Sequence, residues 1–227
     1  SDAPSDDSLY ASASCEVSFS ALSSSSVVDS IVYVAEIKNT GSVPVIFATD
    51  SSIDLCNSNG TLLYTENYIT IQPNVISPGE SAYASIEIFD TFDGLASADL
   101  HCYYTAYNHD VDVPSIDFSG ISVIDSYGAP DVQATATNNS AESYDVFVAV
   151  AIFDENGDLV DCPIGGITLL PNESKGFSQS GSVSSSHDYS GYSAELIPYF
   201  SEIAFLSDFS HPLSLQHTTS FDTANTQ

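Results

Sequence analysis

Most of the side chains in this sequence that could bind an ion or take part in catalysis are carboxylates. The segment DENGDLVD places Asp154, Asn156 and Asp158 at alternate positions, where their oxygens could surround a calcium ion. An EF-hand loop has its glycine at the sixth position, whereas Gly157 is the fourth residue of this segment. Asn-Gly favours a tight hairpin, because both residues tolerate positive φ. We interpret the segment as a turn, with calcium binding as the alternative.

The acids of HDVDVP are the better candidates for a calcium site. Asp110 and Asp112 lie where charge and proline interrupt the strand pattern in the middle of the chain. Loop carboxylates from both sides, including Asp90 or Asp93, could converge there on one hard cation and stiffen a junction. Ordinary solvated linker charge is the alternative. Calcium is the only cofactor that the sequence suggests.

Potential catalytic groups do not form a pattern that predicts an enzyme. Five histidines and many serines are present, but no Gly-x-Ser-x-Gly segment would expose a serine nucleophile. Asp90 and Asp93 could imitate the carboxylate pair of a glycosidase, yet the chain has no tryptophan to form a sugar platform. We therefore predict no catalytic residue.

The four cysteines have neither Cys-x-x-Cys spacing nor a histidine at zinc spacing. Disulfide bonds in an exported protein are accordingly favoured over metal ligation or a thiol nucleophile. Four cysteines allow three connectivities, among which sequence alone cannot choose.

The charge of the chain excludes two classes of partner. Of 227 residues, 31 are acidic and only Lys38 and Lys175 are basic, which gives a net charge of −29. Binding to nucleic acid or to anionic lipid requires basic side chains, so neither partner is expected. The chain contains no apolar run of about 18 residues, so no transmembrane segment is predicted. The first residues have neither the basic n-region nor the apolar h-region of a signal peptide. We expect a processed or trimmed form, with any lipid or wall anchor outside the chain.

The sequence pattern around these residues predicts strands. Apolar residues alternate with a period of two in several short runs, and turn residues rich in Gly, Asn and Pro separate them. The alternating runs begin at Cys15, Ile31, Val45, Ala84, Cys102, Val146 and Leu196. This pattern predicts an all-β fold built from antiparallel β-sandwiches.

Four short segments recur in the same order in the two halves of the chain. IKNTG matches ATNNS, CNSNGTL matches FDENGDL, SPGES matches LPNES, and SADLHCYY matches SAELIPYF. We infer a tandem repeat of one β-sandwich domain. The expected division is an acidic N-terminal tail at 1–12, repeat 1 at 13–109, a linker at 110–117, repeat 2 at 118–215 and a C-terminal tail at 216–227.

The segment VAIFDENG (150–157), with the nearby turns TATNNS and LPNES, resembles the signature of the FxLYD family of bacterial exported domains. The first repeat resembles a more diverged copy, in which Cys56 takes the aromatic position and Asn57 the aspartate position. The resemblance implies two immunoglobulin-like sandwiches on a secreted or lipid-anchored Gram-positive protein. It implies no catalytic residue.

The first and last strands of such a sandwich commonly lie side by side, and this arrangement suggests a disulfide bond. Cys15 and Cys102 lie near the expected starts of those strands in repeat 1, on faces shared with apolar residues. We predict a bond between them that closes a loop of about 90 residues and contributes about 4 kcal/mol. Cys56 and Cys162 could join only if the two repeats fold against each other.

Three functions are compatible with these sequence features. The leading hypothesis is a non-catalytic extracellular or cell-surface module that binds an unknown protein or glycan, mediates adhesion or acts as a spacer. The second is an acid- or salt-adapted, protease-resistant surface protein without a specific partner. An enzyme is the third.

Overall fold

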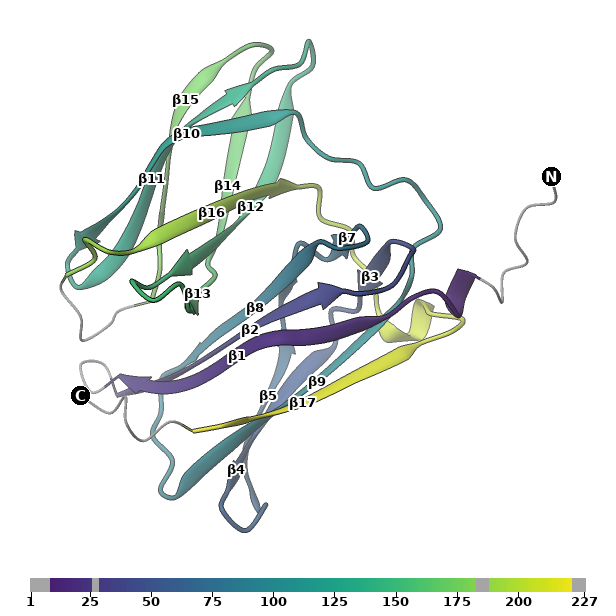
Figure 1. Cartoon of the computed structure of the whole chain (residues 1–227), viewed down its shortest axis with the longest axis vertical. Coiled ribbons are helices and arrows are strands. Elements are labelled where there is room, and N and C mark those ends of the chain that lie inside the picture. Colours follow the sequence, from purple (N-terminus) through teal and green to yellow (C-terminus); the bar gives the residue numbers. More distant parts are fainter. Residues whose placement is uncertain (1–8, 26–28, 183–187, 222–227) are drawn as a thin grey trace.

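The computed structural model describes residues 9–25, 29–182 and 188–221, and strands make up nearly all of the regular secondary structure in these ranges (Figure 1). Every strand pairing in this part of the chain is antiparallel. The predicted all-β sandwich fold is confirmed. Within the described ranges, no helical segment has the length and hydropathy of a membrane span.

The N-terminal sandwich consists of two sheets around one core. Sheet A has the order β1-β2-β8-β6, and sheet B has the order β5-β4-β9-β3-β7 with β17 also paired to β9. The strands are β1 (Cys15–Ser25), β2 (Ser30–Asn39), β3 (Val45–Phe47), β4 (Ser51–Asn57), β5 (Leu62–Ile69), β6 (Ile71–Gln72), β7 (Val75–Ile76), β8 (Ser81–Ile88), β9 (Leu95–Ala106) and β17 (Leu213–Ser220). Alternate residues of β2, such as Tyr33 and Ile37, fill the core between the sheets.

The C-terminal sandwich repeats this plan with fewer strands. Sheet C has the order β10-β11-β15, and in sheet D the strand β12 pairs with β13, β14 and β16. The strands are β10 (Ile116–Ser126), β11 (Ala129–Asn138), β12 (Tyr144–Phe153), β13 (Leu159–Asp161), β14 (Ile164–Leu169), β15 (Ser174–Ser180) and β16 (Ser193–Tyr199). A second apolar core, which includes Val148, Val150 and Ile152, lies between these sheets.

The two sandwiches pack against each other through sheets A and D. A third apolar cluster joins Val34 of β2 and Tyr83 of β8 to Ala149 and Ala151 of β12 and Tyr199 of β16. From Val148 to Ile152, strand β12 is therefore buried on both faces, which explains why this part of the strand does not alternate between apolar and polar residues. At this contact the Ser85 hydroxyl donates a hydrogen bond of 2.5 Å to the buried Asp161 carboxylate.

The repeated sequence segments form repeated turns. The Asn57 side-chain oxygen accepts hydrogen bonds from the backbone N–H groups of Asn59 and Thr61. The Asp154 carboxylate does the same for Asn156 and Asp158, at 2.8 and 3.0 Å. Likewise, the Glu80 and Glu173 carboxylates accept N–H bonds from Ser77 and Leu170, respectively. The two halves thus share local structure where their sequences match.

The C-terminal segment returns to the N-terminal sandwich. After β16, the carbonyl oxygens of Ala204 and His211 accept hydrogen bonds from Thr49 and Thr105. Strand β17 then pairs with β9, with Leu215 opposite Cys102. The 3-10 helix η1 (Leu206–Asp208) lies on this return path.

Several expected boundaries differ from the observed elements. Residues 216–220, expected in a tail, belong to β17, because the alternation of Leu213 and Leu215 continues a buried face against β9. The expected linker 110–117 overlaps the segment 107–115 between β9 and β10. Most of the expected N-terminal tail, residues 1–8, and residues 222–227 lie outside the described residues. Whether each sandwich folds as an independent domain stays a prediction.

Candidate functional site

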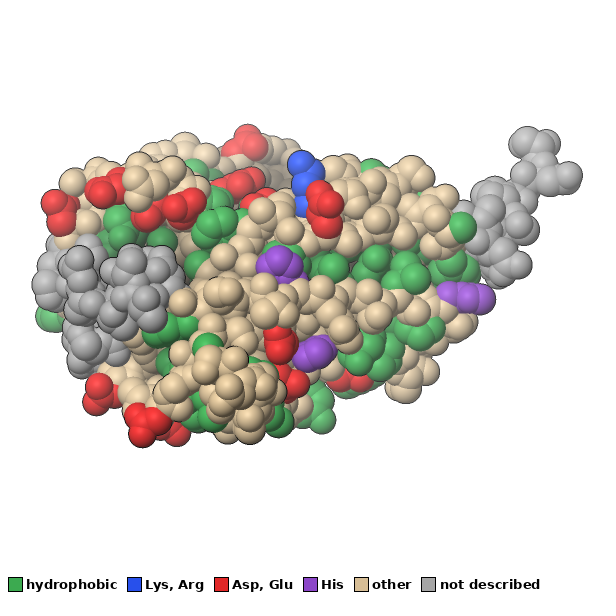
Figure 2. Space-filling view, turned by 60° about the horizontal axis from the view of Figure 1, so that its bottom comes forward, with side chains coloured by type: hydrophobic (Ala, Val, Ile, Leu, Met, Phe, Trp, Pro, Cys, Tyr) green, Lys and Arg blue, Asp and Glu red, His purple; other side chains and the backbone are tan. Residues whose placement is uncertain are grey.

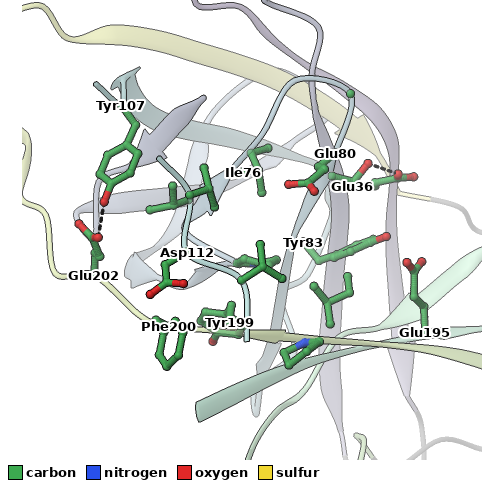
Figure 3. A pocket seen from close by; sticks show the side chains of 18 residues that line it. Glu36, Ile76, Glu80, Tyr83, Tyr107, Asp112, Glu195, Tyr199, Phe200 and Glu202 are labelled. Carbon is green, nitrogen blue, oxygen red and sulfur yellow. Dashed lines mark hydrogen bonds between the residues drawn. The ribbon is translucent and has the colours of Figure 1, made fainter. Parts of the chain in front are cut away.

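A cleft of about 360 Å³ opens at the junction of the two sandwiches (Figure 3). The turn before β8 and strand β8 itself form one wall, β16 forms the facing wall, and the segment 107–113 closes one end. Four aromatic rings line the cleft, those of Tyr83, Tyr107, Tyr199 and Phe200. Five carboxylates also line it, those of Glu36, Glu80, Asp112, Glu195 and Glu202.

Strand pairing determines which side chains reach this cleft. Glu36 and Tyr83 are directly opposite each other in the β2–β8 ladder, on the face of sheet A that points toward the C-terminal sandwich. Glu195 and Ile197 alternate with core residues along β16 and project toward sheet A. The cleft is therefore a product of the contact between the two sandwiches.

Tyr83 marks one end of the cleft, which we call the Tyr83 end. Burial raises the pKa of the Tyr83 hydroxyl, and the nearby charges of Glu195 and Glu36 raise that pKa further. One oxygen of Glu36 accepts a 2.6 Å hydrogen bond from the Ser81 hydroxyl, which fixes that carboxylate at the wall. The ring is thus held neutral beside two negative charges.

Tyr107 marks the other end, which we call the Tyr107 end. Its hydroxyl donates a hydrogen bond to the Glu202 carboxylate. Burial, that hydrogen bond, and the charges of Glu202 and Asp112 together raise the pKa of Tyr107 to about 12. The Asn74 side chain also contacts the backbone of Glu202, so this end is joined to the N-terminal sandwich.

Among the predicted calcium ligands, only Asp112 lies at the cleft. The alternative in which Asp90 or Asp93 joins Asp110 and Asp112 is wrong, because these pairs flank opposite ends of β9. Strand β9 has 12 residues and so spans about 40 Å. Among the described residues, no group of three or more His, Cys, Asp and Glu side chains is arranged to hold a metal ion. Calcium binding at Asp110 and Asp112 stays a prediction.

The segment DENGDLVD forms the predicted turn. One oxygen of the Asp154 carboxylate accepts two backbone N–H groups of the turn, as described above. Gly157 has a φ of 85°, the positive value that is expected for the glycine of an Asn-Gly turn. The turn interpretation is confirmed.

All four cysteines are buried thiols in this structure. Cys15 and Cys102 lie in the same N-terminal core, and the Cys15 N–H donates a 3.1 Å hydrogen bond to Tyr104, two residues from Cys102 on the same face. The expected strand positions of this pair were partly wrong. Cys102 was expected near the start of its strand, but it lies beyond the middle of β9. The strands of Cys15 and Cys102 were expected to lie side by side, but β17 pairs with β9 on the side toward β1. A bond between Cys15 and Cys102 stays a prediction, to be tested by peptide mapping without reduction.

The possible bond between Cys56 and Cys162 is not compatible with this arrangement. Cys56 contacts Asp99 on the outer face of sheet B, with Sγ 3.7 Å from the carboxylate oxygen. Cys162 lies in the apolar contact between the sandwiches, against sheet A. Because packed sheets are about 10 Å apart, the N-terminal core separates the two sulfurs. The two sandwiches do pack against each other, but the N-terminal sandwich does so through sheet A, whereas Cys56 is on sheet B.

The residues of the cleft could not be recognised from local sequence patterns. Tyr83, Tyr107, Glu195 and Glu202 lie just outside the predicted strands, at positions where no local pattern indicates a site. One signal could have located the contact: the apolar run of β12 has the composition of a strand that is buried on both faces. His187, one of the five histidines, lies outside the described residues.

The surface outside the cleft is also acidic. Figure 2 shows acidic side chains spread over the visible face, together with apolar patches and few basic side chains. Among the described residues, the one ion pair joins Asp54 to His101, at 3.4 Å, and requires the imidazole to be protonated. Neither lysine neutralises the cleft through an ion pair in this part of the chain.

Comparisons with known proteins do not identify a family. No protein-family model matches the chain, and no curated protein matches it. Among solved structures, the chain is similar to a β-glucuronidase from glycoside hydrolase family 2 (TM-score 0.26, 13% identity, 69% of this chain and 20% of that chain). It is also similar to a Bacteroides uniformis β-glucuronidase (TM-score 0.28, 13% identity, 85% of this chain and 26% of that chain). The chain spans about a quarter or less of these enzymes, and we transfer no activity from them.

Proposed function

We propose that this chain is a non-catalytic binding module of an extracellular or cell-surface protein, and that the cleft between its sandwiches is the ligand site. The observation that carries this proposal is a cleft of about 360 Å³ lined by four aromatic rings and polar groups. Ligand sites are typically concave, largely apolar and equipped with a few polar groups that fix orientation.

The packing of the sandwiches supports this choice of site. The apolar cluster around Val34, Tyr83 and Ala151 joins the two walls, so that the cleft exists before any ligand arrives. A preformed site loses less conformational entropy when it binds than one that must be assembled. Tyrosine rings add contact area with few rotatable bonds, which makes them effective in recognition sites.

The export of the protein is part of the proposal. Its widely spaced cysteines and its resemblance to exported FxLYD domains support a location outside the cell. The alternative is a surface protein selected for solubility in acid or salt, without a partner. The net charge of −29 favours that alternative as much as it favours binding.

Ligand mapping separates these functions. The full chain, labelled with 15N, is titrated with a panel of small oligosaccharides, peptides, alcohols and amines, and backbone amide shifts are recorded. We expect at least one ligand class to shift amides of Tyr83, Tyr107 and Tyr199. A second groove of about 320 Å³, bordered by Tyr68 and Phe205, provides the internal comparison. Shifts confined to that groove, or no binding by any class, would refute the cleft as the ligand site.

A further inference from the structure

The cleft has two negative ends and an apolar middle. Glu36 and Glu195 lie near Tyr83 at one end, and Asp112 and Glu202 lie near Tyr107 at the other end (Figure 3). Each pair is close enough for its charges to raise the pKa of the neighbouring tyrosine. In the view of Figure 3, Ile76 and Tyr199 lie between the two ends. Four of the five carboxylates therefore form two groups along the cleft, with apolar side chains between them. The fifth, Glu80, lies between Ile76 and Glu36 in Figure 3, on the Tyr83 side of Ile76.

Among the residues that the structure describes, no lysine forms an ion pair with these carboxylates. The lining contains no lysine, and the chain has no arginine. Lys38 lies two residues beyond Glu36 on β2, where it is exposed, and it makes no ion pair within the described structure. The cleft is thus a concave surface whose potential is negative at both ends, and its walls of low dielectric constant strengthen that potential.

We propose that the cleft binds a linear aliphatic amine that carries a positive charge at each end, a conclusion that rests on the proposed function above. Each ammonium group would lie beside one pair of carboxylates and the face or hydroxyl of the neighbouring tyrosine. The methylene chain would pack against Ile76, Ile197 and Tyr199. Ile76 and Tyr199 are already buried, so the half-buried Ile197 is the one of these three that loses contact with water. A free diamine and a peptide with two nearby lysines share this chemistry.

A small cation with a single charge could neutralise the carboxylates at only one end of the cleft. The carboxylates surround the cleft from different elements, with Glu36 on β2, Glu195 on β16 and Asp112 on the 107–115 segment. A compact cation could contact one end only, whereas a ligand with two separated charges contacts both. The preference for two charges over one is therefore the property that the experiment must measure.

The test compares ligands of equal length and different charge. Isothermal titration of the full chain in low salt uses 1,5-diaminopentane, 1-aminopentane and 1,5-pentanediol, together with a Lys-Ala-Lys peptide that has blocked ends. We expect the diamine to bind about tenfold or more tightly than the monoamine, and the diol not to bind measurably. Tighter binding of the peptide than of the diamine would assign the charges to lysine side chains, and the reverse to a free amine.

Matched variants identify the two ends. Glu195→Gln at the Tyr83 end and Asp112→Asn at the Tyr107 end each remove one charge from the cleft. Each should reduce diamine affinity about threefold to tenfold and reduce the preference for diamine over monoamine. Glu142→Gln removes one charge from an exposed turn of the C-terminal sandwich and should leave both values unchanged. Circular dichroism checks that every variant is folded.

Two results would overturn the inference. Equal losses in Glu142→Gln and in the cleft variants would show a general effect of net charge, and equal affinities for the diamine and the diol would show that charge is not recognised. If the amide mapping finds a neutral ligand in the cleft while the diamine fails to bind, the binding module stands and the cation proposal falls. If no ligand reaches the cleft, both fall.

Discussion

At the level of single residues, several carboxylates stabilise turns by accepting hydrogen bonds from backbone N–H groups. Asp154 illustrates the point, since its spacing in the sequence fits an ion site and its geometry fits a turn. The equivalent residue of the first half, Asn57, accepts hydrogen bonds from the two corresponding backbone N–H groups of its own turn. A neutral amide therefore performs the same role, which identifies hydrogen bonding as the function that both residues share.

This equivalence predicts different outcomes for two substitutions of Asp154. Asp154→Ala removes the acceptor of two backbone N–H groups and should lower the free energy of unfolding by about 1–2 kcal/mol. Asp154→Asn should change it by less than about 0.5 kcal/mol, because the amide oxygen can accept the same bonds. Urea denaturation measures both. A larger loss in Asp154→Asn than in Asp154→Ala would mean that the charge itself matters at this turn.

The buried thiols predict a loss of stability in alkali. Burial raises the pKa of Cys15 to about 12, and burial together with the neighbouring Cys15 raises that of Cys102 to about 12, both from 9.0. Because the folded state favours the protonated thiols, their stabilisation is fully present below pH 9. It is lost as the pH rises from 9 toward 12, by up to about 1.4 kcal/mol per pH unit for each thiol.

Denaturation of the reduced protein between pH 8 and 11 measures this loss. The double substitution of Cys15 and Cys102 by alanine should lower stability at pH 8 because it leaves cavities, but it should make the fall above pH 9 less steep. Unchanged steepness in the double variant would show that other groups cause the alkaline loss. The thiols of Cys56 and Cys162 remain in both proteins and provide a common background.

At the scale of elements, the sequence predicted the strands better than their partners. The alternation of Ile31, Tyr33 and Ile37 correctly placed β2 and its buried face. The short segment of β17 also alternates, but its partner β9 lies more than 100 residues earlier, and no local pattern specifies such a pairing. The cleft was beyond prediction for the same reason, because its walls come from β8 and β16 and meet only when the sandwiches pack.

The contribution of β17 can be tested by truncation. Removal of residues 209–227 exposes the edge of β9, and the apolar side chains of Leu213 and Leu215 no longer cover the N-terminal core. We expect this truncation to cost about 3 kcal/mol or more in the N-terminal sandwich. Hydrogen exchange read by mass spectrometry should show faster exchange in β1 and β9 than in β11 and β12. Removal of residues 222–227 alone leaves β17 in place and is the control.

Two fragments test whether the C-terminal sandwich folds by itself. A fragment of residues 115–227 carries β17 without its partner β9, whereas a fragment of residues 115–209 lacks β17. If the C-terminal sandwich is an independent domain, both fragments should give β-rich spectra, and the shorter one should aggregate less because it has no unpaired strand. Loss of structure in both would mean that this half requires sheet A.

At the scale of the whole molecule, the contact between the sandwiches connects stability to the proposed function. Ala149 and Ala151 face sheet A, while Val148, Val150 and Ile152 on the same strand face the C-terminal core. The two sets share β12, so this strand carries both the fold of one sandwich and the position of the cleft. The small alanine side chains allow the sheets to approach closely, and a larger or charged residue there would force them apart.

Substitution of Ala151 by aspartate therefore tests whether the cleft depends on this contact. An unpaired charge at a fully buried position should cost about 2–5 kcal/mol if the contact stays closed, and separation of the sheets relieves that cost by hydrating the carboxylate. We expect a larger radius of gyration by small-angle X-ray scattering, a retained β spectrum, and loss of any ligand that maps to Tyr83 and Tyr107. Ala141→Asp places the same charge in an exposed turn and should alter none of these. An unchanged radius with full ligand affinity in Ala151→Asp would show that the 107–115 segment and β17 hold the walls in place without the apolar contact.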